Sequence, residues 1–197
     1  MTLPKQFLGR FVQALNAEIG RDTLRMLLNK GGMGAELADP GPAFRLDEAA
    51  ASLAYDGIQA ELRLHYGRGA RGILVRIGRL MWPYLLADAP LFLRARLRGV
   101  RFLPSSWQVK LALELLASLL RGESNNIAVH SLDLDYMIVD HGFSTIKSRD
   151  VSEPICFVTL GLLQECVYCA SGRELDVTET SCRAAGANAC EFHIRAG

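Results

Sequence analysis

The sequence predicts an α+β fold in which a helical N-terminal half packs on a sheet formed by the C-terminal half. Up to about residue 120, apolar residues recur with a period near 3.6, which is typical of helices that bury one face. Beyond residue 126 the period becomes two in several short runs, which indicates strands. The chain has 197 residues, 50% of them hydrophobic, and this is enough to bury a core as one compact unit.

The first helices are marked by apolar periodicity and by residues that favour helix ends. We expect helices over 7–19, over 22–31 with Asp22 as its cap, and over 47–67 with Asp47 as its cap. Gly20 and Gly67 are expected to end two of them, because glycine readily adopts the conformations found after a last helical turn. Residues 32–45, rich in glycine and proline, are expected to form a loop.

Further helices are expected over 70–82, where Pro83 interrupts the pattern, and over 90–98. The next helix is the clearest of the N-terminal half. Ser105 and Gln108 form a capping-box pattern, leucines follow at helical spacing, and Gly122 closes the run. Because this helix is apolar nearly all round, we expect it to be buried against several neighbours.

The C-terminal half predicts four strands around one more helix. The strands are expected over 126–133, 134–141, 174–182 and 190–195. Pro154 suits the first turn of a helix that runs to about Ala170, and Gly172 is its expected stop. Residues 142–153 are expected to form a polar loop.

The net charge of +1 names no partner, but the charges are unevenly distributed. The arginines at 63, 68, 71, 76, 79, 94, 96, 98 and 101 face few acidic residues nearby. They form either a solvated helix face or a surface that attracts an anionic partner. Neither a signal peptide nor a membrane span is recognisable, and five cysteines without a secretion signal favour a reducing compartment, so we expect a cytoplasmic protein.

All five cysteines follow Pro154, at positions 156, 166, 169, 182 and 190. Glu179-x-x-Cys182, together with Cys156 and Cys190, provides three thiols and one carboxylate, a complete ligand set for tetrahedral zinc. Small buried cysteines and a surface glutamate are the alternative. In a regular strand Glu179 and Cys182 point to opposite faces, so a metal site requires a bulge or a strand that ends near residue 181.

The cysteine-rich segment resembles the 4-vinyl-reductase domain family in about 40 residues. The pattern is Pro154-Ile155-Cys156, Gly161, Gly172, Glu179-x-x-Cys182, Ala185-Gly186 and Cys190-x-Phe192. The family includes aromatic-sensing domains of phenol-responsive activators, accessory proteins of bacteriochlorophyll synthesis and small stand-alone proteins. The resemblance implies a fold similar to the vesicle-tethering TRAPP subunits, with an antiparallel four-stranded sheet. It implies a helical part over 1–100 and a 4-vinyl-reductase-like part over 101–197.

The resemblance also implies site residues. A structural zinc ion is expected on Cys156, Glu179, Cys182 and Cys190. The candidate ligand-binding residues are Trp107, which is also expected in the core, His130, Leu160 and Val177. Leucine and valine stand where the phenol sensors place tyrosines, which favours a ligand larger or less polar than phenol. Trp82 is a candidate for the rim of the pocket, and His193 for a contact beside Cys190. The pair Cys166 and Cys169 lies late in its helix, which favours buried or idle thiols over a redox pair.

The sequence therefore predicts a non-enzymatic protein that binds or senses a small hydrophobic or aromatic molecule. One alternative is a tetrapyrrole carrier or accessory protein of bacteriochlorophyll synthesis, because arginines suit porphyrin carboxylates. A second alternative is a tethering or assembly subunit. We expect a homodimer formed through helix 7–19, a possible protein partner and no direct contact with nucleic acid. No catalytic triad, phosphate loop or dinucleotide motif is present.

Overall fold

The computed structural model describes residues 6–39, 46–100, 103–121, 127–142, 151 and 153–196. The helices are α1 (Phe7–Ile19), α2 (Arg21–Lys30), α3 (Glu48–Tyr66), α4 (Ala70–Asp88), α5 (Leu91–Val100), α6 (Ser105–Leu120) and α7 (Phe157–Ser171). The strands are β1 (Ile127–Leu132), β2 (Asp135–Asp140), β3 (Asp176–Ser181) and β4 (Cys190–Arg195), and short 3-10 turns are η1 (Ala35–Ala38), η2 (Gly67–Gly69) and η3 (Arg183–Ala185). The expected α+β architecture is confirmed.

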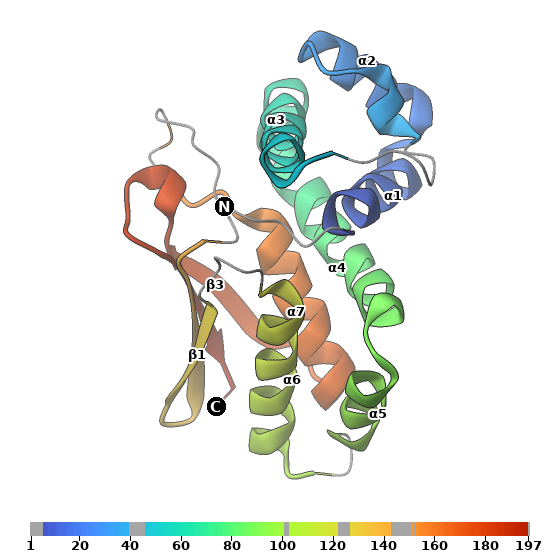
Figure 1. The fold of residues 1–197 in the computed structure, drawn as a ribbon. Coiled ribbons are helices and arrows are strands. Elements are labelled where there is room, and N and C mark those ends of the chain that lie inside the picture. Colours follow the sequence, from blue (N-terminus) through green and yellow to red (C-terminus); the bar gives the residue numbers. More distant parts are fainter. Residues whose placement is uncertain are drawn as a thin grey trace.

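The elements form a sheet layer and a helix layer, with a helical extension at one end (Figure 1). Helices α6 and α7 cover one face of the sheet, and α4 packs behind α7. Helices α1, α2 and α3 gather at the end of the molecule where the turn η3 lies. The end of the β3–β4 hairpin is therefore directed toward the N-terminal helices.

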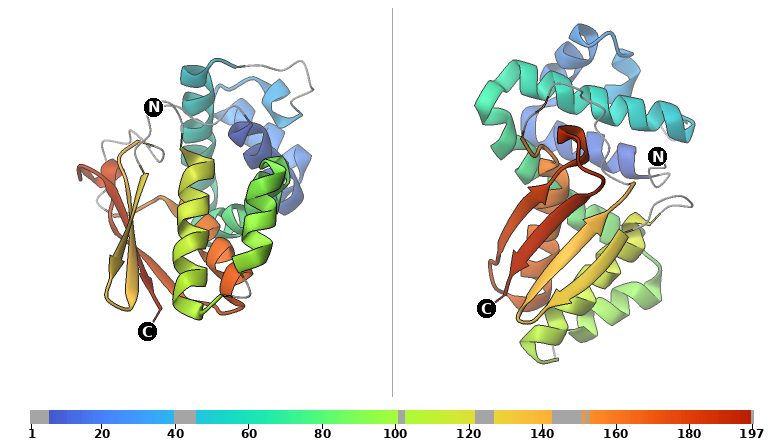
Figure 2. Two further views of the ribbon diagram at one scale, coloured as in Figure 1. Left: turned by 60° about the horizontal axis from the view of Figure 1, so that its bottom comes forward. Right: turned by 90° about the vertical axis from the view of Figure 1, so that its left-hand side faces the viewer.

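The sheet is antiparallel with strand order β1-β2-β4-β3. Side chains alternate between its faces, so Ile138, Phe192 and Ile194 are buried under the helices. The opposite face carries no helix, as the view onto the sheet shows (Figure 2). Burial on one face only explains the alternating sequence pattern that predicted these strands.

Several helix ends follow the sequence signals. Asp47 caps α3 by accepting a hydrogen bond of 2.7 Å from the Ala50 amide, and Gly172 ends α7 in a left-handed conformation with φ of 70°. Two expectations are wrong: α2 begins after Gly20, with Asp22 inside its first turn, and α4 continues through Pro83. The capping box of Ser105 involves a side chain outside the described residues.

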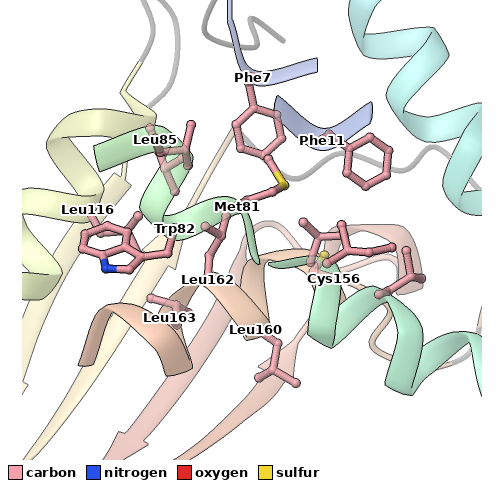
Figure 3. Close-up of a cluster of buried hydrophobic side chains, with 14 of the residues drawn as sticks. Phe7, Phe11, Met81, Trp82, Leu85, Leu116, Cys156, Leu160, Leu162 and Leu163 are labelled. Carbon is pink, nitrogen blue, oxygen red and sulfur yellow. The ribbon is translucent and has the colours of Figure 1, made fainter. Parts of the chain in front are cut away.

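Two glycines bring α4 and α7 into backbone contact. A Cβ on Gly78 would lie 2.1 Å from the Val158 carbonyl oxygen, and one on Gly161 would lie 2.0 Å from that of Val75. Only glycine allows such an approach, which accounts for Gly161 in the family-like pattern. The crossing joins the predicted parts 1–100 and 101–197 through a continuous core (Figure 3).

The apolar face of α1 is buried inside the chain. Phe7, Phe11 and Leu15 are fully inaccessible, and both phenylalanine rings pack edge-on against Tyr55 of α3. The width of this face was the reason to expect a dimer through helix 7–19, and packing within one chain now accounts for it. The homodimer stays a prediction without that support.

Among the helices of the described part of the chain, none combines the length and apolar composition needed to cross a membrane. The arginines after residue 62 do not form one uniform face. Arg76 pairs with Glu18, and Arg79 pairs with Glu174, which fixes both to neighbouring elements. Arg63, Arg68 and Arg71 instead line a groove beside η2.

Candidate metal centre and neighbouring hollows

Four potential metal ligands converge between the start of α7 and the hairpin of β3 and β4. The donor atoms of Cys156, Glu179, Cys182 and Cys190 all lie within 4.8 Å of one another. Cys156 is the residue before the first turn of α7, Glu179 lies on β3, Cys182 follows β3, and Cys190 begins β4. The structure thus brings together all four residues of the expected set.

A β-bulge solves the problem of opposite faces. Glu179 pairs with Phe192, but Ser181 pairs with the next partner along, Glu191, so one residue of β3 is extra. This extra residue reverses the alternation, and the side chains of Glu179 and Cys182 both reach the covered side of the sheet. The expectation of a bulge or a strand end near residue 181 is confirmed.

The spacing of the sulfurs matches a shared metal ion better than a disulfide. The Cys156 sulfur lies 3.7 Å from that of Cys182 and 3.5 Å from that of Cys190. A disulfide requires about 2.05 Å, whereas a tetrahedral zinc with bonds of about 2.3 Å sets its sulfurs about 3.8 Å apart. The Arg183 amide donates to the Cys190 sulfur at 3.3 Å, a bond that stabilises a thiolate.

The cluster concentrates acidic groups where water is scarce. The sulfurs belong to buried residues, and Glu179 is half-buried. Burial, followed by the hydrogen bond with Cys182, raises the pKa of Glu179 to about 8. Hydrogen bonds with Cys182 and Cys190, together with burial, raise the pKa of Cys156, whereas hydrogen bonds from Cys156 and Cys190 lower that of Cys182. Protons therefore hold the cluster together by sharing a single negative charge.

A divalent cation suits this donor set. It would replace the shared protons and allow all four groups to ionise together. One carboxylate oxygen of Glu179 accepts the Cys156 amide at 2.9 Å, while the other is buried without a hydrogen-bond partner among the described residues. That unpartnered oxygen and three thiols are the donors that a closed tetrahedral zinc site uses. The cluster can therefore hold a metal ion.

The other two cysteines stand apart from this cluster. Cys166 is fully buried, and its thiol donates to the Ala112 carbonyl of α6 at 3.3 Å. Burial raises its pKa, which opposes thiolate chemistry. Cys169 contacts Glu165 one turn earlier in the same helix. These contacts agree with the interpretation of Cys166 and Cys169 as structural thiols.

The predicted ligand-binding residues do not share one site. Trp107 is 61% exposed at the start of α6, so its expected place in the core is wrong. His130 is exposed on the uncovered face of the sheet, beside Met137. Leu160 and Val177 are buried, and Leu160 lines the groove beside η2.

Two further positions differ from expectation. Trp82 is 1% exposed within the core and forms no rim of a pocket (Figure 3). His193 points to the uncovered face, opposite to Cys190 and Phe192, and lies 3.3 Å from Asp135. It is therefore not a neighbour of the thiols, because residues an odd number apart in a regular strand face opposite ways.

The structure has a closed interior cavity that the sequence interpretation missed. It lies between α6, α7 and the β1–β2 hairpin and offers about 10 Å³ to the centre of a water-sized sphere. Its apolar walls contain two polar groups, the hydroxyl of Thr159 and the carboxylate of Asp140. Both residues are buried, and the Thr159 hydroxyl has no hydrogen-bond partner in the described part of the chain.

Sequence signals for these two residues existed. Asp140 follows Tyr136 and Ile138 at a period of two, which places a carboxylate on the buried face of β2. Its Oδ1 accepts the Gly142 amide at 2.9 Å. Thr159 is a polar residue inside an otherwise apolar helical run. A buried polar group in such a setting is informative, because most of them are paired.

The fold and the cluster together define a helical domain attached to an α+β unit that can hold a metal. Residues 145–196 match the model of the vinyl-4-reductase domain, so the resemblance to the 4-vinyl-reductase family is confirmed for this part of the chain. No curated protein matches the sequence.

Solved structures support the same class of fold. The phenol-responsive sensory domain of the transcription activator PoxR, bound to phenol, is 14% identical with a TM-score of 0.53, over 74% of each chain. An H-NOX protein from S. oneidensis in the Fe(II)NO state is 15% identical with a TM-score of 0.61, over 98% of this chain and 99% of that one. An H-NOX mutant from K. algicida is 11% identical with a TM-score of 0.63, over 98% and 97%. At these identities the likeness concerns the fold.

Proposed function

We propose that this protein is a non-enzymatic sensor or binding protein for a small hydrophobic or aromatic molecule, stabilised by one structural zinc ion. The interior cavity is the observation that carries the proposal. Its walls are apolar, and the unpartnered Thr159 hydroxyl and the Asp140 carboxylate provide polar groups that can orient a guest. The sensory domains among the similar folds are consistent with this role.

The size of the cavity suggests how binding produces a signal. About 10 Å³ accommodates a single water-sized group, so an aromatic ring enters only when the walls separate. The walls belong to α6, α7 and the β1–β2 hairpin, which means that a bound ring displaces a helix relative to the sheet. A ligand that binds only the widened form shifts the population toward it.

The zinc ion has a structural role in this proposal. Three thiolates and one carboxylate leave no open coordination position, which is typical of structural zinc. The ion would tie the start of α7 to the β3–β4 hairpin, two elements that interior packing must hold while the cavity widens. Because the ligands converge only in the folded chain, metal binding contributes directly to stability.

The ligand is tested with phenol and toluene, two probes of similar size that differ in one hydroxyl group. Calorimetry should detect binding of at least one probe, and Leu163→Ala, which enlarges the cavity, should increase the affinity for toluene. Thr159→Val should selectively weaken phenol, whereas His130→Ala, on the uncovered sheet face, should change neither. Absence of binding to the enlarged variant would contradict the cavity as a ligand site. A visible absorption band of purified protein would instead favour the tetrapyrrole alternative.

The metal is tested with Cys182→Ser, with Cys166→Ala as its matched control. Cys182→Ser should lose zinc and melting temperature together, since it removes one ligand. Cys166→Ala removes a buried thiol outside the cluster and should keep the zinc content of the parent. Zinc loss without a change in melting would show that the metal is not structural.

A further inference from the structure

The largest hollow of the described structure is a groove beside η2, separate from the interior cavity. It is open to solvent, encloses about 810 Å³, and lies among α3, η2, the start of α4, the segment before α7 and strand β3. The two hollows share no lining residue. A volume of this size accommodates an organic molecule far larger than phenol.

The groove has an apolar floor and a basic side. Ile155, Phe157 and Leu160 provide apolar surface, and Phe157 and Leu160 are on the first turn of α7. Arg68 and Arg71 are exposed on η2 and α4. The Arg71 guanidinium lies 5.6 Å from the centre of the Phe157 ring, so it lies where the basic side meets the floor.

The basic charge in the groove is available to a ligand. Neither Arg68 nor Arg71 has an ion-pair partner among the described residues, in contrast to Arg76 and Arg79. Arg63 adds a third guanidinium, and its Nη1 atom is buried without a hydrogen-bond partner in the described part of the chain. Buried guanidinium nitrogens are seldom left unpaired, because desolvation without compensation is unfavourable.

Acidic residues do not cancel this charge. Glu153 and Glu179 also line the groove, so the arginines outnumber the carboxylates there. Glu179 is engaged at the cysteine cluster, where its Oε2 atom accepts the Cys156 amide. The remaining glutamate leaves the side formed by η2 and the start of α4 positively charged.

We propose that this groove binds an amphipathic anion, a molecule with one carboxylate or phosphate head group and an apolar body. The head group is held by Arg68 and Arg71, with Arg63 deeper in the groove, and the body lies over Phe157 and Leu160. Guanidinium groups suit both kinds of head group, since they pair with either through two parallel hydrogen bonds. The site does not require occupancy of the interior cavity.

Isothermal titration with decanoate, decyl phosphate and decanol tests the proposal. The zinc-loaded parent protein should bind at least one acidic probe about tenfold or more tightly than decanol, the gain expected for charge-assisted hydrogen bonds. The tighter of the two acidic probes identifies the head group. Raising the salt concentration should weaken the acidic probe and leave decanol unchanged, because exposed charges are screened.

The variants separate head-group recognition from general hydrophobic binding. The double variant Arg68→Gln/Arg71→Gln should lose the preference for the acidic probe, while Arg76→Gln, on the same helix but outside the groove, should keep it. Equal affinity of the parent for acidic probe and alcohol, or a preference that survives the double variant, would overturn the proposal. Toluene binding should be the same in all variants, so failure of this site is distinguishable from failure of the interior cavity.

Discussion

Replacement of Gly78 by alanine tests the α4–α7 crossing, the contact that unites the helical part with the metal-binding part. The added Cβ would lie 2.1 Å from the Val158 carbonyl oxygen and 2.9 Å from the Leu162 amide nitrogen. These atoms belong to the backbone, so no side chain can rotate away. The helices must separate by about 1 Å to restore ordinary contact distances, a local overpacking that typically costs about 1–3 kcal/mol.

Gly72 provides the matched control on the same helix. A Cβ there meets no other atom within 4 Å, so alanine should leave stability unchanged or raise it by up to about 1 kcal/mol through its better helix propensity. Gly78→Ala gains the same propensity but loses the crossing, and we expect a net loss of about 2 kcal/mol. Gly161→Ala, on the opposite side of the crossing, should behave like Gly78→Ala.

Urea unfolding followed by circular dichroism, with every variant in the same excess of zinc, measures the difference. Midpoints should fall for Gly78→Ala and Gly161→Ala and stay level or rise for Gly72→Ala. If Gly78→Ala is as stable as Gly72→Ala, the backbone contact does not exist in solution, and the argument from the crossing fails.

The remaining predictions concern local contacts. Asp47→Ala should lower the free energy of unfolding by about 1 kcal/mol through loss of the α3 cap, while Asp47→Asn should keep most of it; equal losses would exclude the capping role. Acidification should release zinc as protons compete for the three thiolates, with a chromogenic chelator as the readout; release independent of pH would contradict thiolate ligation. His193→Ala should leave zinc affinity unchanged, because the side chain lies on the other face of the sheet; weaker zinc binding would place it beside the cluster.

The sequence predicted the parts of the structure that local signals determine. Asp47 and Gly172 mark helix ends through their own backbone and side-chain preferences, and both are where expected. The metal cluster was also predictable, because ligand type and spacing restrict its geometry. The requirement that Glu179 and Cys182 share a face even anticipated the bulge in β3.

Features that depend on long-range packing were missed. Pro83 was expected to end a helix, yet it lies inside α4, a case in which tertiary packing overrides a local preference. Trp82 and Trp107 exchanged their expected surroundings, one being buried and the other exposed. Which face of a strand is covered depends on its partners, and this is why His130 was assigned to the pocket.

The two hollows show the same limitation. The interior cavity depends on the register between β1 and β2 and on how closely α6 and α7 approach the sheet. The groove joins η2 to a segment about 85 residues later in the chain. The sequence displayed the arginines, but it could not separate those that pair with Glu18 or Glu174 from those that face the groove.

X-ray absorption spectroscopy at the zinc edge addresses the principal hypothesis most directly. Protein purified without chelator should contain one zinc per chain, with three sulfur neighbours at about 2.3 Å and one oxygen neighbour at about 2.0–2.2 Å. Glu179→Gln should change the oxygen shell and leave the three sulfurs in place. A zinc ion surrounded by nitrogen and oxygen only, or protein that binds no zinc when the metal is supplied, would contradict the structural role assigned to these four residues.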